Sequence, residues 1–337
     1  MLGRASTRAR SKLPPMRRIL WGLALGVVMA GCGARSSLPL PGDGDETGTG
    51  AGGDRPSGSG GAPGGTGANG SGGDGGAGGG EPFVEQCEDL DLLFVYVVTS
   101  ETDLYKFDPS TSTFTRIGAL TCPAQAGATP FSMAVSRSGR AYSVFTSGEL
   151  FRINVKTASC QKTDWSPLIG DFSVFGMGYA IDDDGLDESL YVADIDFESG
   201  VSAGLGRLDT QTFSLDPRGP FSTNPGSAIE LTSADDGQLY GYFINNGQTG
   251  GTLVRIDKDN AEILEQTPLP PPTSADQGAL AFAYWNGDFY IFTGRNGSST
   301  VTRYRPSTGE VADIASLDRE IVGAGVTTCD PGEADGL

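Results

Sequence analysis

Residues 104–108 have the sequence Leu-Tyr-Lys-Phe-Asp, and this pattern decides the fold because it returns along the chain. The later copies are LFRIN at 150–154, LGRLD at 205–209, LVRID at 253–257 and VTRYR at 301–305. Successive copies are spaced by 46, 55, 48 and 48 residues. Each begins with an aliphatic residue, carries a basic residue at its third place and alternates as a β-strand does. We therefore predict one such strand in each of five repeats.

Further strand segments surround this strand in most repeats. A strand with an aromatic residue precedes it, and a strand rich in small residues comes earlier, with turn signals such as Asn286-Gly287 between the two. The aromatic residues are Tyr96, Tyr142, Tyr191, Tyr240 and Tyr290. The small-residue segments are 131–135, 175–179, 231–234 and 279–283. A fourth strand follows the basic one, as at 114–117 and 310–314. Four short antiparallel strands per repeat are typical of a β-propeller blade.

The first repeat lacks its own small-residue strand. Residues 321–327, IVGAGVT, have the composition of that strand but stand near the other end of the chain. Small residues belong on the innermost strands of a propeller because these strands converge on the axis. The sequence therefore predicts an all-β fold, a five-bladed β-propeller of four-stranded antiparallel blades closed by pairing of the C-terminal strand with the N-terminal ones.

Four cysteines lie in or next to the predicted propeller, namely Cys87, Cys122, Cys160 and Cys329. An even number of cysteines in an exported domain indicates two disulfides, for which three pairings are possible. Ring closure makes the segments beside Cys87 and Cys329 neighbours, so we predict this pair, which leaves Cys122 with Cys160. A metal site of four thiolates is the alternative, but the chain has no CxxC pair to favour it.

The N-terminal region has the features of an export signal. Residues 1–18 are basic and polar, and Ile19–Ala30 form an apolar run that is short for a membrane span but typical of a signal peptide. The run ends in Met29-Ala30-Gly31-Cys32, which resembles the lipobox of bacterial lipoproteins, although Met stands where Leu is usual. The resemblance implies cleavage after Gly31 and lipidation of Cys32. An ordinary signal peptide with a chance cysteine is the alternative.

A glycine-rich segment separates this signal from the repeats. Residues 33–80 contain 21 glycines and only two large aliphatic residues, so the segment cannot bury enough apolar surface to fold. A flexible coil of this length has a mean reach on the order of 40 Å. We divide the chain into a signal peptide at 1–31, a lipidated cysteine with a disordered linker at 32–81, and a propeller domain at 82–337.

The repeats, together with the start Cys-Gly-Ala-Arg-Ser-Ser after the signal, resemble bacterial outer-membrane-type lipoproteins with a single β-propeller domain, such as uncharacterised myxobacterial propeller lipoproteins. This resemblance implies attachment to the cell envelope by a lipid anchor, outside the cytoplasm. Because Gly33 stands where Asp would favour inner-membrane retention, the outer membrane is the expected site. The resemblance implies no activity.

The charge and composition of the chain exclude several functions. The formal net charge is −19, and residues 1–32 hold six basic residues and no acidic one, so the mature chain is still more acidic. Such a chain repels nucleic acid and anionic lipid surfaces. The chain has no histidine, which excludes a Ser-His-Asp triad, a Cys-His dyad and imidazole metal ligands.

Several polar or aromatic residues are candidate site residues. The acidic turn with Asp182, Asp183, Asp184 and Asp187 could bind calcium, although it lacks the full spacing of a calcium loop. A solvated hairpin turn, in which Asp-Gly is expected anyway, is the favoured interpretation. Glu230 begins an innermost strand and could face the central pocket, where five-bladed glycosidases of the arabinanase type place their carboxylates. Trp285 could stack on a sugar or pack against a neighbouring blade.

The basic residue at the third place of each repeated strand could form a ring of anion-binding groups. These residues are Lys106, Arg152, Arg207, Arg255 and Arg303. Their strand lies away from the axis, however, so we expect each to pair with an acid or to pack its stem between blades.

These features favour a non-catalytic binding or scaffold module that acts as a monomer on an unknown protein or glycan. The alternative is a carbohydrate-active, glycosidase-like enzyme that uses inner-strand carboxylates, but a pair of carboxylates is required and the inner strands offer only Glu230. Apart from the possible calcium ion, no cofactor is expected.

Overall fold

The computed structural model describes the propeller region of the chain. The described residues are Cys87, 93–166, 172–183, 185, 187–195, 202–223, 226, 228–244, 250–270 and 278–329. The predicted signal peptide, the predicted lipidation site Cys32 and the predicted linker lie outside them. No helix in the described part of the chain is long and apolar enough to cross a membrane.

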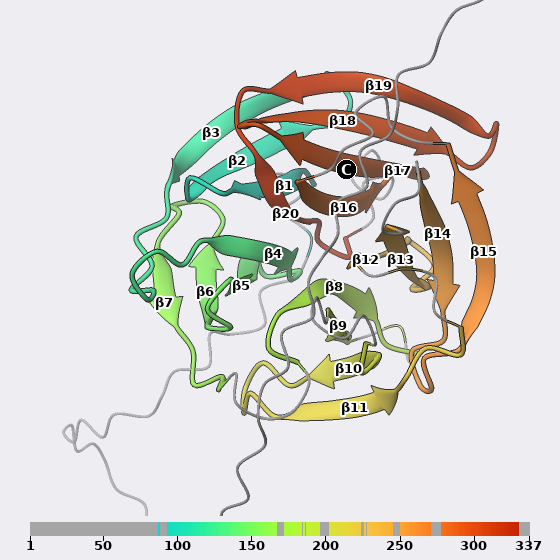
Figure 1. The fold of residues 1–337 in the computed structure, drawn as a ribbon, viewed down its shortest axis with the longest axis horizontal. Helices are drawn as coiled ribbons and strands as arrows, with labels where there is room; N and C mark the ends of the chain where they lie inside the picture. Colours follow the sequence, from blue (N-terminus) through green and yellow to red (C-terminus); the bar gives the residue numbers. More distant parts are fainter. Residues whose placement is uncertain are drawn as a thin grey trace, which may run out of the picture. The chain divides into compact units, whose positions relative to one another are not determined.

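Five four-stranded antiparallel sheets surround a common axis in this region, which confirms the predicted five-bladed propeller (Figure 1). Listed from the innermost strand outward, blade 1 contains β20 (Ile321–Gly325), β1 (Val95–Thr99), β2 (Asp103–Asp108) and β3 (Thr113–Ala119). Blade 2 contains β4 (Pro130–Val135), β5 (Arg140–Phe145), β6 (Leu150–Asn154) and β7 (Cys160–Lys162). Blade 3 contains β8 (Phe175–Ile181), β9 (Glu188–Asp194), β10 (Leu205–Leu208) and β11 (Leu215–Gly219).

The two remaining blades follow the same order. Blade 4 contains β12 (Ala228–Ser233), β13 (Leu239–Ile244), β14 (Gly251–Ile256) and β15 (Ile263–Leu269). Blade 5 contains β16 (Ala279–Trp285), β17 (Asp288–Arg295), β18 (Ser298–Arg305) and β19 (Glu310–Leu317). The tight turns between strands use residues with positive φ, as at Asn286 (47°) and Gly287 (84°), where the sequence predicted a hairpin.

The inner strands β20, β4, β8, β12 and β16 pack side by side in a closed ring. Small residues allow this close approach. A Cβ atom added to Gly176 on β8 would lie 2.0 Å from the Ile229 carbonyl oxygen on β12, and one added to Gly323 on β20 would lie 2.8 Å from the Met133 nitrogen on β4. Only glycine fits where two backbones come this near.

The hydrophobic core lies between neighbouring blades. One cluster joins Tyr96 and Val98 of blade 1 to Met133 and Val135 of blade 2. Others join the remaining neighbours in the same way, because each inner and second strand contributes apolar residues to both faces of its sheet. The packing therefore fixes each blade through the two blades beside it.

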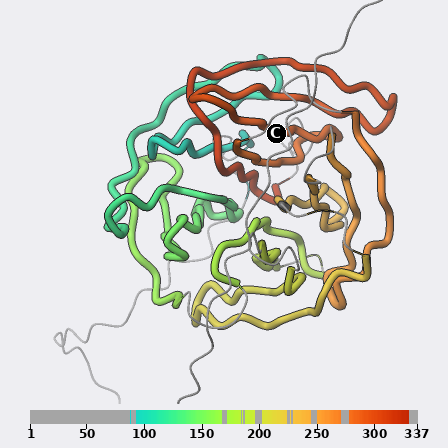
Figure 2. The backbone as a smooth tube through the Cα atoms, viewed as in Figure 1, coloured from blue at the N-terminus to red at the C-terminus, as the bar shows by residue number. Residues whose placement is uncertain are grey.

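The ring closes where the sequence predicted. β20 pairs antiparallel with β1, so the C-terminal strand completes the first blade, and the red C-terminal backbone returns to the blue-green first blade in Figure 2. Cys87 and Cys329 form a disulfide at this seam, and Cys122 forms a second disulfide with Cys160. Both predicted pairings are confirmed.

One strand boundary differs from the prediction. β12 begins at Ala228 rather than at residue 231, so Glu230 is its third residue and not its start. The physical reason is that both faces of an inner strand are buried. Ile229 and Leu231 enter the core between blades 3 and 4, and Glu230 between them is buried as well, so a polar residue here does not mark an end.

Candidate functional site

The structure places Glu230 in the packed centre of the ring. The residue is only 3% exposed. Its Oε2 accepts a 2.7 Å hydrogen bond from the hydroxyl of Ser132 on β4, although β8 lies between β4 and β12 in the ring. The Ser132 hydroxyl accepts a 3.2 Å hydrogen bond from the backbone N–H of Met177 on β8. One buried network thus joins three inner strands.

The environment of Glu230 favours its neutral form. Burial raises the pKa of this carboxyl well above its ordinary range, and the hydrogen bonds from Ser132 and Met177 only partly oppose the shift. Glu230 is also the only acidic residue on the five inner strands. Glycoside hydrolysis requires two carboxyl groups, roughly 5–10 Å apart, on either side of the scissile bond. The inner strands do not supply that pair.

The acidic turn after β8 is only partly described. Asp182, Asp183 and Asp187 belong to the described residues, whereas Asp184 lies outside them. The Asp182 Oδ2 accepts a 2.9 Å hydrogen bond from the Ser189 hydroxyl, and Asp183 forms a 2.9 Å ion pair with Lys258. Across the described residues, no group of three acids, cysteines or histidines is arranged to hold a metal ion. The calcium site gains no support from them and stays a prediction.

The same turn forms one wall of a charged pocket between blades 3 and 4. The volume of this pocket is about 200 Å³. Its lining residues are Asp182 and Asp183 after β8, Tyr191 on β9, Arg207 on β10, Arg218 on β11, and Lys258 and Asp259 after β14. We call it the interblade pocket. It is smaller than the roughly 300–1,000 Å³ typical of sites for drug-sized ligands, so it suits a small polar molecule.

Lys258 joins the two blades at the interblade pocket. Its Nζ donates a 2.7 Å hydrogen bond to the Ile181 carbonyl oxygen and lies 2.9 Å from the Asp183 Oδ1. The Lys258 side chain is 15% exposed, so this ion pair is partly shielded from solvent and neutralises one acid of the turn. Lys258 and Ile181 are 77 residues apart in the chain, which explains why sequence analysis did not link them.

Arg218 has long contacts to its acidic neighbours. Its Nη2 lies 3.4 Å from Asp216, and its Nη1 lies 4.0 Å from Asp259. Charge-assisted N–H to carboxylate hydrogen bonds are about 2.7–2.9 Å long, and the fold reaches such distances elsewhere, as between Arg305 and Asp288 at 2.8 Å. The Arg218 Nε is buried and has no acceptor among the described residues.

Tyr191 contributes an uncharged polar group to this pocket. Burial raises the pKa of its phenol to about 12, so the hydroxyl stays protonated at any physiological pH. Tyr191 pairs with Arg207 across β9 and β10, and Arg207 pairs with Asp216 across β10 and β11. The register therefore sets these three residues side by side across the blade.

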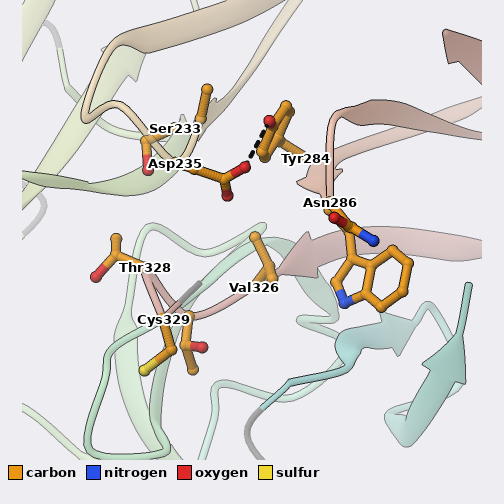
Figure 3. Close-up of a pocket in the computed structure, with 10 residues that line it drawn as sticks. Ser233, Asp235, Tyr284, Asn286, Val326, Thr328 and Cys329 are labelled. Carbon is orange, nitrogen blue, oxygen red and sulfur yellow. Dashed lines mark hydrogen bonds between the residues drawn. The ribbon is translucent and has the colours of Figure 1, made fainter. Parts of the chain in front are cut away.

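Trp285 packs against a neighbouring blade rather than standing exposed as a sugar-stacking surface. It is half-buried against the apolar cluster between blades 5 and 1, and its Nε1 donates a 2.6 Å hydrogen bond to the Leu93 carbonyl oxygen. The adjacent gap in Figure 3, crossed by the 2.8 Å hydrogen bond from Tyr284 to Asp235, has a volume of about 10 Å³. Such a gap has room for about one water molecule.

Glu188 is a half-buried ionisable residue whose role sequence analysis missed. Its Oε1 accepts a 2.8 Å hydrogen bond from the Arg137 backbone N–H, and its Oε2 accepts a 2.9 Å bond from the Thr328 hydroxyl. It thus ties the start of β9 to a turn of blade 2 and to the segment beside Cys329. Burial raises the pKa of Glu188 to about 7 despite these donors. The turn sequence Asp-Gly-Leu-Asp-Glu gave no signal of this role.

Comparison with solved structures found remote likenesses. A chain of a nidogen/laminin complex has a TM-score of 0.44 and 8% identity, over 69% of this chain and 97% of that one. An exo-β-1,3-galactanase from Phanerochaete chrysosporium has a TM-score of 0.41 and 9% identity, over 65% of this chain and 53% of that one. A TolB-like protein from Agrobacterium tumefaciens has a TM-score of 0.37 and 13% identity, over 70% of this chain and 80% of that one. No family model and no curated protein sequence match the chain. At these TM-scores the likenesses carry no argument about function.

Proposed function

We propose that this chain is an envelope lipoprotein whose β-propeller is a non-catalytic binding module. The observation that supports the non-catalytic role is the state of Glu230. The only acid on the inner strands is buried, and its burial disfavours the ionised form and raises its pKa. It is hydrogen-bonded to Ser132 and has neither a partner carboxylate nor access to a substrate. The interblade pocket, by contrast, offers charged side chains to a small ligand.

The envelope location in this proposal rests on the sequence. The apolar run of residues 19–30 and the lipobox-like Met29–Cys32 support lipidation of Cys32 and a monomer attached to the outer membrane by its acyl chains. Two acyl signals hold a protein far better than one chain does. The glycine-rich linker would then let the propeller reach ligands on the order of 40 Å from the anchor.

Fractionation of cells expressing the full chain tests the anchor. Wild-type protein should be found in the membrane fraction and carry acyl mass on Cys32, and Cys32→Ser should release it from that fraction. A Cys32→Ser protein that still fractionates with membranes, beside a wild type without acyl mass, would overturn the lipoprotein assignment.

A binding and turnover screen tests the non-catalytic role. Mature wild-type protein in detergent would be incubated with a glycan panel, and both bound glycan and newly released reducing ends would be measured. We expect saturable binding without release of reducing ends. Release that Glu230→Gln abolishes would instead establish the glycosidase-like alternative.

A further inference from the structure

The five repeats provide an internal comparison for the basic residue at the third place of each repeated strand. In four blades the structure gives this residue a partner within its own blade or beside it. Lys106 lies over the Phe94 ring at 4.1 Å, and Arg152 donates a 2.6 Å hydrogen bond to Gln161. Arg255 lies 3.6 Å from Glu265, and Arg303 lies 3.5 Å from Glu310. Arg255 and Arg303 therefore pair with an acid as expected. The partners of Lys106 and Arg152 are instead an aromatic ring and a side-chain amide.

Blade 3 departs from this pattern at Arg207. Its cross-strand neighbour on the outermost strand is Asp216, the position that Glu265 holds opposite Arg255 in blade 4. Asp216 lies instead within 3.4 Å of Arg218, and Arg207 has no ion pair or side-chain hydrogen bond with any described residue. Arg207 is exposed and lines the interblade pocket. Among the five repeated basic residues, Arg207 is thus the one without a close side-chain partner among the described residues, and it lines a cavity.

Arg218 in the same pocket has two acidic neighbours, and the nearer one lies about as far away as the acids beside Arg255 and Arg303 do. Its two carboxylate neighbours, Asp216 and Asp259, lie at 3.4 and 4.0 Å and have side chains that are 66% and 76% exposed. Exposed carboxylates at these distances bind a guanidinium weakly and can turn out into solvent. The buried Nε of Arg218 has no acceptor among the described residues, and a native protein rarely leaves a buried donor unpaired.

The pocket lining is electrically balanced, with three acidic and three basic residues. Lys258 neutralises Asp183 at 2.9 Å, and the Asp182 Oδ2 is engaged by Ser189. The described residues place no acceptor within hydrogen-bond distance of the Arg207 guanidinium or of the Arg218 Nε, and Tyr191 lies beside Arg207 in the register. Planar guanidinium groups pair best with carboxylate or phosphate oxygens, often by two parallel hydrogen bonds.

From these observations we infer that the interblade pocket binds a small oxyanion, a carboxylate or phosphate group, through Arg207 and Arg218. The inference rests on the proposed function, because it gives the binding module a ligand class. Bound oxyanion would replace the exposed carboxylates of Asp216 and Asp259 as the partner of Arg218 and would give Arg207 the partner that its counterparts already have.

Calorimetric titration of mature protein at low ionic strength tests the inference with three probes. D-Glucuronate carries a carboxylate, inorganic phosphate carries the other oxyanion, and D-glucose is the neutral control for glucuronate. We expect saturable binding of glucuronate or phosphate and none of glucose. The stronger of the two oxyanions identifies whether a carboxylate or a phosphate ligand is the natural class.

Two arginine variants and one matched control locate the site. Arg207→Gln and Arg218→Gln should each weaken oxyanion binding by roughly tenfold or more, the loss of a hydrogen bond to a charged group. Arg255→Gln removes the equivalent residue of blade 4, outside the pocket, and should bind as wild type does. Asp259→Asn removes a competing carboxylate and should strengthen binding. Melting curves establish that each variant is folded.

Three results would overturn the inference. One is the absence of saturable binding of either oxyanion to wild-type protein, another is equal binding of glucose and glucuronate, and the third is equal weakening by Arg255→Gln and Arg207→Gln. Each is independent of the release of reducing ends in the turnover screen, so a failure of this inference is distinguishable from a failure of the non-catalytic assignment.

Discussion

Glu230 should make the stability of the propeller depend on pH. Because burial raises its pKa well above the ordinary value of 4.5, the folded protein keeps this proton at pH values where the unfolded chain has lost it. The contribution of Glu230 to the free energy of unfolding is thus fully present below the ordinary pKa of the carboxyl and decreases as the pH rises above it. We expect Glu230→Gln to melt at a higher temperature than wild type at pH 8 and at a nearly equal temperature at pH 4, as followed by circular dichroism.

Glu149 is the matched control for Glu230, because folding lowers the pKa of Glu149 whereas it raises that of Glu230. The hydrogen bond from Lys162, 2.6 Å long, lowers the pKa of Glu149 and outweighs its burial. Its contribution to stability is present above the ordinary pKa and is lost as pH falls. Glu149→Gln should therefore melt below wild type at pH 8, with a smaller difference at low pH. Equal pH dependence of the two variants would contradict both assignments.

Glu188 provides a second test, in a narrower pH window. Its pKa rises from 4.5 to about 7, so the wild-type protein loses stability between these values as the unfolded chain ionises first. Glu188→Gln removes this loss while keeping an acceptor for the Arg137 N–H. We expect the melting temperature of the variant to exceed that of wild type above pH 7 and to approach it below pH 4.5. A variant that melts lower than wild type at every pH would show that the Thr328 contact outweighs the burial of charge.

At the scale of the strands, close packing of β8 against β12 predicts the effect of one methyl group. Gly176→Ala would place a Cβ atom 2.0 Å from the Ile229 carbonyl oxygen, so backbones must move. We expect a loss of about 1–3 kcal/mol in the free energy of unfolding, measured by urea denaturation. Gly118→Ala is the control, because its Cβ would meet only the Ala158 side chain, at 3.2 Å. Equal losses would contradict the special role of the inner strands.

The strands show why the sequence predicted the fold but only some residues of the candidate site. The alternation in Leu253–Ile256 and the glycines of Phe175–Tyr179 are local patterns with one physical cause each, so they predicted the strand and its place in the blade. The interblade pocket has no such pattern. It forms because Asp216 lies near Arg218 rather than Arg207, and because Lys258 reaches Asp183 from the next blade. Contacts between residues this distant in the chain leave no periodic signal.

The predicted start of β12 was wrong for a related reason. Sequence patterns treat a charged residue as exposed, and this assumption is sound for most strands. Glu230 violates it because the ring buries both faces of an inner strand and supplies Ser132 from β4 as a hydrogen-bond partner. The presence of the residue at the axis could be anticipated, whereas its burial and its hydrogen bond to Ser132 depend on the closed ring.

At the scale of the whole molecule, the propeller depends on joining its two ends. β20 is the innermost strand of blade 1, yet it comes last in the chain, so the ring is complete only when the C-terminal segment pairs with β1. The disulfide between Cys87 and Cys329 spans 242 residues, whereas that between Cys122 and Cys160 spans 38. The first constrains nearly the entire domain, and the second constrains only the exit of blade 1 and the outer edge of blade 2.

This difference in loop length predicts that removing the two disulfides lowers the free energy of unfolding by unequal amounts. A cross-link stabilises a fold mainly by restricting the unfolded chain, and the restriction grows with the logarithm of loop length. For separations of 242 and 38 residues, the longer loop gives about 1.6 kcal/mol more stabilisation. We therefore expect Cys87→Ser/Cys329→Ser to lower the free energy of unfolding, measured in urea, by more than Cys122→Ser/Cys160→Ser does. Since both variants keep every strand pair, the difference isolates the covalent link at the seam. An equal or smaller loss for the seam variant would contradict the loop-length argument and would mean that the seam cysteines do not provide the main restraint on the chain ends.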